Sequence, residues 1–332
     1  MTPEPEPEPA PAPAPKPAPE PAPEPARAAF LRACELDVRV RKPGNVSQAS
    51  AGHGMDAALF LASAQAAAGP LCARGARVGQ RVEEAVHASW RVAGCNTNLG
   101  ILLLCAPIAL AVERQPAATT QRALRAAINR VLADLDTGDA VATYRAIVRA
   151  NPGGLGAAEQ QDVHQVPRVD LRSAMALAAQ RDSIALQYRD GYAQVFEIGL
   201  AALGAAFVPG ADDPRGGGPD AATVAAVQRA YLALLSAIPD SHIVRKRGAG
   251  SAALVMRDAT AWHGRAQAGA NLDSDPDFAA WDSALKADGI NPGTTADLLV
   301  ASMMIAGLTR AKCSKKGWAL GVREGVRSAP GS

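Results

Sequence analysis

Apolar side chains recur every three or four residues along most of the chain, the pattern of amphipathic helices. Between residues 119 and 136 the stripe consists of Leu124, Ile128, Val131, Leu132 and Leu135. The alternation typical of strands is nearly absent. We therefore predict an all-α fold, a single large domain of about ten helices. Similar apolar spacing marks residues 27–40, 56–68, 73–92, 98–113, 139–149, 171–207, 221–237, 250–268, 277–288 and 295–310.

Both ends of the chain differ from this helical region. Residues 1–26 hold twelve of the 25 prolines and consist almost wholly of Pro, Ala and Glu. Alternating proline removes backbone donors and favours an extended chain, so we expect a disordered tail there. Residues 311–332 are rich in Lys, Gly and Ser and read as a flexible extension. No internal boundary divides 27–310, which we expect to be the folded domain.

Charge argues against a nucleic-acid binder. The chain carries a net +2, and the tail, with five glutamates and one lysine, accounts for −4, which leaves +6 on residues 27–332. These cations are spread along the chain without clusters or interleaved aromatics, so no nucleic-acid partner is expected. Aromatic residues make up only 4% of the chain, so Ala, Leu, Val and Ile must fill the core.

Membrane and secretion signals are also missing. The longest apolar run, from Leu99 to Val112, has 14 residues and contains Gly100 and Pro107. It falls short of the about 20 residues of a bilayer span and predicts a buried core helix. The N-terminus lacks the basic and apolar regions of a signal peptide. The five cysteines are odd in number and form no C-x-x-C pair, which suits a reducing compartment. We expect a soluble cytoplasmic protein with no membrane partner.

Polar residues cluster at a few helix ends, and the first such cluster runs from Glu35 to Ser47. Lysine is rare between residues 27 and 310, where only Lys42, Lys246 and Lys286 occur. A lysine among many arginines indicates a need for a compact ammonium, here followed by Pro43, Gly44 and Asn45. The alternative is that Lys42 ends a helix and favours its dipole.

Two further clusters precede apolar helices. His53 and Asp56 stand before the run 57–68, where Asp56 is either the N-cap of that helix or part of a phosphate-binding cleft. Asn96, Thr97 and Asn98 precede the most apolar helix. One of these three side chains suffices as a cap, so the other two predict contacts with a ligand.

The fourth cluster comprises two late loops. Residues 240–248 combine a carboxylate, His242 and three cations, Arg245, Lys246 and Arg247. Residues 291–297 open another apolar helix, where hydroxyl and backbone donors suit an anion and Asp297 suits a metal ion. A solvated basic turn and an ordinary helix start are the alternatives.

Taken in order, these clusters resemble the motifs of the triphosphoribosyl-dephospho-coenzyme A synthase family, which makes the prosthetic-group precursor of citrate lyase and malonate decarboxylase. The resemblance covers roughly residues 30–310. It is carried by Glu35…Lys42-Pro43-Gly44-Asn45-Val46…Gly52-His53…Asp56, by Gly94-Cys95-Asn96-Thr97-Asn98-Leu99-Gly100, by Asp240-Ser241-His242-Ile243…Arg245-Lys246 and by Asn291-Pro292-Gly293-Thr294-Thr295-Ala296-Asp297-Leu298.

The chain departs from the citrate-lyase-linked members at two places. Asn98 stands where they usually have histidine, and their middle G-x-R-G-E-A segment is not recognisable. This chain has Asp162-Val163-His164 and Arg181-Asp182 instead. The pattern is closer to a branch of methylotrophic and methane-cycle organisms, which is discussed together with methanopterin-type cofactor synthesis. The acceptor substrate therefore stays open.

The resemblance implies a glycosyl transfer in which the ribose 2′-hydroxyl of 3′-dephospho-CoA attacks C1′ of ATP and adenine leaves. On this basis Lys42, Arg245 and Lys246 would bind the triphosphate, helped by Asn45, Asn291, Gly293 and Thr294. Asp56 and Asp297 would hold Mg²⁺. Glu35 would lie near the reacting ribose or orient Lys42. The base or ribose would be fixed by Asn96, Thr97 and Asn98. His53 or His242 would transfer the proton.

Two other functions remain open at this stage. One is a related ribosyl or phosphoribosyl transfer from ATP to another acceptor, in tetrahydromethanopterin-type one-carbon cofactor synthesis. The other is a helical scaffold without enzymatic activity, whose N-terminal tail binds an unknown protein partner. The scaffold predicts polar clusters far apart on the surface, whereas either transferase predicts that they meet in one pocket.

Overall fold

A computed structural model describes residues 24–50, 56–153, 160–205, 207–213 and 218–310 of the chain. These residues form helices and no strand, which confirms the all-α prediction; their only β pairing is two isolated bridges. The α-helices are α1 (Pro25–Arg39), α2 (Ala57–Leu71), α3 (Val78–Ala93), α4 (Leu99–Arg114), α5 (Gln121–Ala133), α6 (Thr137–Ala150), α7 (Leu171–Ala178), α8 (Ser183–Asp190), α9 (Ala201–Leu203), α10 (Ala221–Ala237), α11 (Ser241–Gln267), α12 (Pro276–Ala287) and α13 (Gly293–Arg310).

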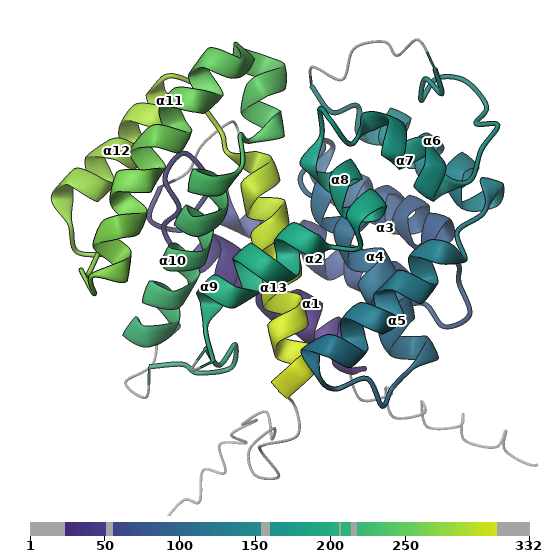
Figure 1. Ribbon diagram of the computed structural model, residues 1–332, viewed down its shortest axis with the longest axis horizontal. Helices are drawn as coiled ribbons and strands as arrows, with labels where there is room; N and C mark the ends of the chain where they lie inside the picture. Colours follow the sequence, from purple (N-terminus) through teal and green to yellow (C-terminus); the bar gives the residue numbers. More distant parts are fainter. Residues whose placement is uncertain (1–23, 51–55, 154–159, 206, 214–217, 311–332) are drawn as a thin grey trace, which may run out of the picture.

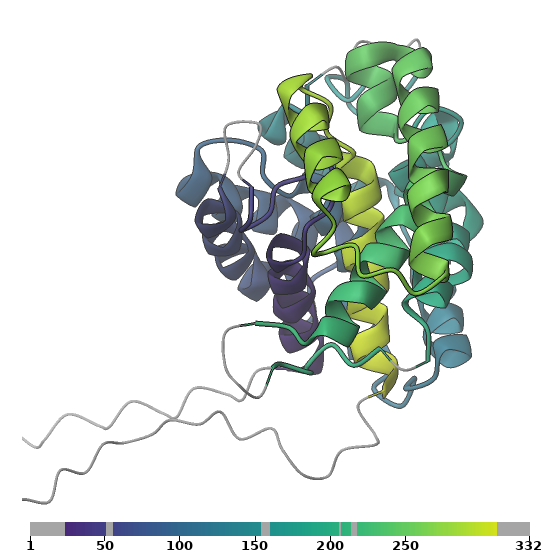
Figure 2. The ribbon, with the colours of Figure 1, turned by 90° about the vertical axis from the view of Figure 1, so that its left-hand side faces the viewer.

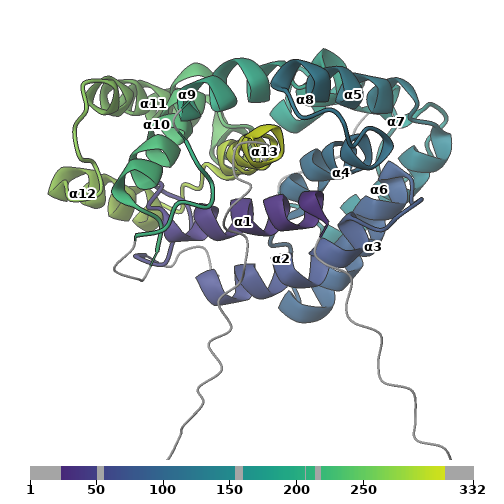
Figure 3. The same ribbon diagram turned by 90° about the horizontal axis from the view of Figure 1, so that it is seen from below.

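Helix α13 runs through the middle of the molecule. Helices α10, α11 and α12 lie on one side of it and α3 to α8 on the other (Figure 1). Helix α1 packs along α13, as the side view shows (Figure 2), and from below α13 is seen nearly end-on among its neighbours (Figure 3). Such a position explains why α13 is apolar on all sides, since a helix that is hydrophobic all round is a buried one.

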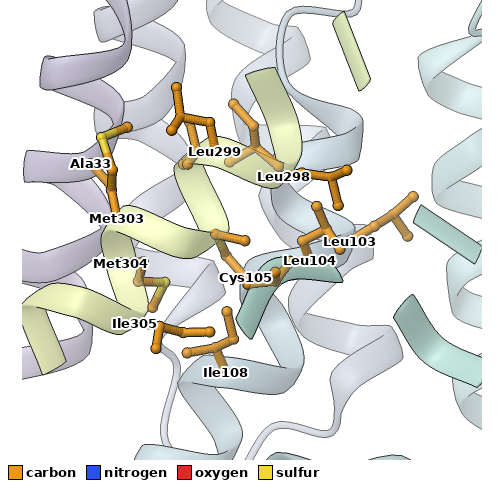
Figure 4. Close-up of a cluster of buried hydrophobic side chains, with 14 of the residues drawn as sticks. Ala33, Leu103, Leu104, Cys105, Ile108, Leu298, Leu299, Met303, Met304 and Ile305 are labelled. Carbon is orange, nitrogen blue, oxygen red and sulfur yellow. The ribbon is translucent and has the colours of Figure 1, made fainter. Parts of the chain in front are cut away.

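The centre of the core lies between α13 and α4. Leu299 and Met303 of α13 lie with Leu104 and Cys105 of α4 among the buried side chains, and Ala33 of α1 joins them (Figure 4). All five have at most about a hundredth of their surface exposed. The run expected as a buried core helix is therefore α4, and the burial of its apolar side chains favours folding.

Helix boundaries differ from the expected ones where local polar residues intervene. Helix α1 begins at Pro25, with Ala26 already buried, so the predicted tail of residues 1–26 extends two residues too far. Proline suits the first helical turn because its missing N–H has no partner there in any case. The segment 171–207, expected as one helix, is divided into α7, α8, a π-helix (Val195–Leu200) and α9. Gly191, with φ of 64°, ends α8.

Helix α11 contains a break that matters for the site. Gly248 has φ of +85° and separates the turns bearing Arg245 and Lys246 from the longer second part. A left-handed residue inside a helix requires glycine. No single helix of the described ranges has both the length and the apolar composition of a membrane span; α10 and α11 meet that criterion only as a pair bent by 54°.

Candidate active site

A cavity of about 740 Å³ opens between the two halves of the molecule. Its lining includes residues of the first turns of α4, α8, α11 and α13. The first turn of a helix has a partial positive charge, which attracts anions. At α8 and α11 the carboxylates of Asp182 and Asp240 already accept from backbone N–H groups of this turn.

Most of the site residues expected from the sequence meet in this cavity. Segments as far apart as the starts of α4 and α13 contribute to one wall, as either transferase requires and contrary to the scaffold expectation. The expected residues that line it are Asn45, Asn96, Thr97, Asn98, His242, Arg245, Lys246, Asn291, Gly293, Thr294 and Asp297.

Asp297 is the unusual group of this cavity. Its carboxylate makes no hydrogen bond or ion pair with any described residue. Burial raises its pKa well above the ordinary value, and the charges of Asp240, Asp37 and Asp182 raise it further, while Arg245 opposes them. Arg245 thus offsets part of the cost of this charge, and the carboxylate forms no ion pair within the described residues. Its side chain lies against Gly100, where a Cβ atom would be 2.0 Å from Oδ2.

Two of the neighbouring carboxylates, Asp240 and Asp182, cap helices. Asp240 caps α11 by accepting from the backbone N–H of His242 at 2.9 Å, and it also accepts from the backbone and hydroxyl of Thr295 at 2.7 and 2.8 Å. It thereby joins the starts of α11 and α13. Asp182 caps α8 and pairs with Arg245 at 2.7 Å. Neither aspartate was assigned a role from the sequence, although each stands directly before its helix, as N-caps do.

Cations occupy the α11 side of the cavity. Arg245, Lys246 and Arg247 line it, together with Arg181. The Nε of Arg245 is buried and has no hydrogen-bond partner. The Lys246 ammonium has no ion pair with a described residue, and it reaches toward Gly153, where a Cβ would lie 3.4 Å from Nζ. These donors remain available for an anion.

The three polar residues before α4 have separate functions in the structure. Asn96 accepts from the backbone N–H of Leu99, the first residue of α4, at 3.1 Å, whereas the N-cap residue Asn98 makes no side-chain capping bond. Asn98 accepts from the hydroxyl of Ser89 at 2.9 Å, and Thr97 lies 3.1 Å from the same hydroxyl. The Nδ2 of Asn98 is buried at the cavity without a partner. A buried donor of this kind costs free energy until a ligand accepts from it.

Lys42 does not line the cavity, contrary to its expected contact with triphosphate. Its side chain is fully buried. The ammonium is 3.0 Å from Asp37 and donates to Asn45 at 2.5 Å, and both of these partners line the cavity. Asp37 lies inside the cluster from Glu35 to Ser47, but it was missed because Glu35 was the carboxylate of the motif that carried the resemblance. Burial raises the pKa of Asp37, and Lys42 opposes that shift.

Glu35 and Asp56 also lie away from the cavity lining. Glu35 pairs with Arg32 at 2.7 Å and with Arg39 at 3.0 Å. Asp56 is exposed and accepts from the backbone N–H of Leu59 at 2.8 Å, so its N-cap interpretation is correct. Asp56 thus does not line the cavity that Asp297 lines. His53 lies outside the described residues.

Comparisons with known proteins identify the family and a similar fold. Residues 23–316 match the family model of ATP:dephospho-CoA triphosphoribosyl transferase. The fold is similar to the crystal structure of a provisionally assigned triphosphoribosyl-dephospho-CoA synthase from Archaeoglobus fulgidus, with a TM-score of 0.58 and 23% identity, over 76% of this chain and 97% of that one. A structural similarity at this level of identity shows a shared fold. No curated protein matches the chain. The resemblance seen in the motifs is thus confirmed by the family match.

Proposed function

The chain belongs to the ATP:dephospho-CoA triphosphoribosyl transferase family, and we propose that it transfers the triphosphoribosyl group of ATP to the ribose 2′-hydroxyl of 3′-dephospho-CoA. The acceptor oxygen forms a bond to C1′ while the bond from C1′ to adenine breaks. The hydroxyl proton is lost and adenine leaves protonated. The observation that carries the proposal is one cavity with an unpaired carboxylate, free cationic donors and four helix starts.

The cations of α11 would bind the triphosphate. Among the described residues Lys246 has no ion pair and the buried Nε of Arg245 has no acceptor, so both can face phosphate oxygens while another nitrogen of Arg245 pairs with Asp182. The backbone N–H of Thr294, in the first turn of α13, adds a donor on the neighbouring wall, whereas the N–H of Gly293 already donates to the carbonyl of Asn291 at 2.8 Å. Charge-assisted hydrogen bonds of this kind are about twice as strong as neutral ones.

Magnesium fits the carboxylate of Asp297. Among the described residues this carboxylate has no hydrogen-bond or ion-pair partner, and burial together with the charges of Asp240 and Asp37 raises its pKa more than Arg245 lowers it. Mg²⁺ is usually held by one or two carboxylates together with substrate phosphates, so a single free aspartate is sufficient. When bound, the ion would neutralise phosphate charge. The described residues contain no group of three or more His, Cys, Asp or Glu that would hold a metal by themselves.

Other residues would act on the reacting sugar and base. Positive charge builds on the ribose as the glycosidic bond breaks, and a nearby carboxylate stabilises it. Asp37 lines the cavity and can take the role first expected of Glu35. His242 packs against Gly293, where a Cβ would be 2.6 Å from its Nδ1, and faces the cavity as a proton carrier. Asn98 would donate to the base or ribose.

Product analysis tests this function. The protein is incubated with ATP, Mg²⁺ and 3′-dephospho-CoA, and the products are resolved by mass. The proposal expects free adenine together with an acceptor heavier by one triphosphoribosyl unit. Adenine release only with a pterin or an aromatic amine would instead support the alternative acceptor. Absence of adenine release with every acceptor, from well-folded protein, would contradict both.

A further inference from the structure

A turn at the end of α1 brings a buried cation next to an amide. Pro43 and Gly44 occupy the centre of the turn, Gly44 has φ of +80°, and the N–H of Asn45 donates to the carbonyl of Lys42 at 2.9 Å. Proline followed by a residue of positive φ is typical of a type II turn. The turn is fixed from outside, because Asp282 accepts from Gly44 N–H at 2.8 Å. Lys42 and Asn45 therefore face each other.

A chain of hydrogen bonds continues from this turn to the cavity. Lys42 Nζ donates to Asn45 Oδ1 at 2.5 Å, and Asn45 Nδ2 donates to Asn291 Oδ1 at 2.9 Å. Lys42 is completely buried and Asn45 is 8% exposed, whereas Asn291 is partly exposed at the cavity wall. The Nδ2 of Asn291 has no partner among the described residues.

The ammonium sets the direction of this chain. The amide of an asparagine can take two orientations that exchange its oxygen and its nitrogen, and its hydrogen-bond partners decide between them. An ammonium has donors only, so Asn45 must turn its oxygen to Lys42 and its nitrogen to Asn291. Asn291 must then accept with its oxygen. Its nitrogen is left as the group that can face the cavity.

We propose that Lys42 is a positioning residue that, through Asn45, fixes Asn291 as a hydrogen-bond donor to an acceptor atom of bound ATP. This inference rests on the proposed function, because ATP is its ligand. A buried ammonium cannot contact phosphate, but Lys42 can position Asn291 through Asn45 from inside the protein. We call the hydrogen-bonded chain of Lys42, Asn45 and Asn291 the amide relay.

Asn45→Asp reverses the relay with little change in shape. The introduced carboxylate would keep a favourable contact with Lys42 but could only accept, so Asn291 would turn its nitrogen inward and present oxygen to the ligand. We expect ATP affinity to fall about tenfold more than in the matched control Asn151→Asp. Asn151 lines the same cavity and has φ of 45°, which aspartate tolerates, so the control adds the same charge outside the relay.

A second measurement does not depend on Asn45→Asp folding. In the nitrogen–proton NMR spectrum of the wild type, the side-chain amide signal of Asn291 is the one absent from Asn291→Asp. We expect this signal to shift when ATP is added. Equal affinity in the two Asn→Asp variants, or an Asn291 signal unmoved while calorimetry shows ATP bound, would overturn the relay and leave the proposed function standing. Wild-type protein that binds no ATP would overturn both.

Discussion

The carboxylate of Asp297 occupies the space that a side chain at position 100 would need. A Cβ atom on Gly100 would lie 2.0 Å from Asp297 Oδ2, far inside van der Waals contact. The contact joins the first turn of α4 to the second turn of α13. It gives a physical reason for the glycine that closes the polar segment 94–100.

Gly100→Ala should therefore damage the site rather than the helix. Alanine favours a helix over glycine by about 1 kcal/mol, but here its methyl group must displace Asp297 or the nearby Ile184. We expect MgATP affinity to fall at least about tenfold. The matched control is Gly264→Ala in α11, where a Cβ meets nothing within 4 Å. The control should raise the unfolding temperature and leave affinity unchanged; equal affinities in the two variants would contradict the contact.

Asp297→Asn should separate stability from binding. The pKa of the carboxylate is raised in the folded state, so the folded state holds the proton more tightly than the unfolded state. The free energy of unfolding therefore falls as the pH rises toward that pKa and the carboxylate becomes charged. In EDTA, the variant should unfold at a higher temperature than the wild type at neutral pH. This gain should be largest at high pH and shrink toward acid. Thermal scans across pH check it, and a variant less stable than the wild type at high pH would show that Asp297 is not an uncompensated charge.

Lys246→Met should weaken ATP binding through the phosphates. The ammonium has no ion pair with a described residue, so its loss removes little stability but one charge-assisted contact, which corresponds to about tenfold or more in affinity. Adenosine binding should change little. Arg257→Met is the control on the same helix, since Arg257 is exposed and pairs only with its neighbour Asp258 at 2.8 Å. Equal losses for ATP and adenosine would place Lys246 away from the phosphates.

Asp56→Ala tests the separation of Asp56 from the cavity. Loss of its bond to Leu59 N–H should cost about 1 kcal/mol of stability, as for other N-caps. The Mg²⁺ concentration needed for half-maximal adenine release should stay that of the wild type. Asp56→Asn, which retains a capping oxygen, should restore stability. A shift in the Mg²⁺ requirement of both variants would return Asp56 to the metal site.

The helices could be predicted from the sequence because a helix with one buried face carries apolar side chains every three or four residues. Apolar side chains recurring every three or four residues identified the segments of α4, α5 and α13. The division of 171–207 was missed because capping by Asp182 and the left-handed Gly191 act locally and do not interrupt the apolar stripe.

The candidate site could be predicted in part. Polar side chains at helix starts, such as Asn98 and Asp297, were recognisable because they are costly to bury without a function. Lys42 was assigned to a ligand because its rarity signals a special environment, and that environment proved to be a buried pair with Asp37. No one-dimensional pattern shows on which side of a turn an ammonium will point.

Titration calorimetry of MgATP into the wild type and Asp297→Asn tests the central claim most directly. We predict saturable binding to the wild type, weakened when EDTA removes magnesium, and at least about tenfold weaker MgATP binding to Asp297→Asn. Folded wild-type protein that shows no binding, or a variant that binds MgATP as tightly as the wild type, would contradict it.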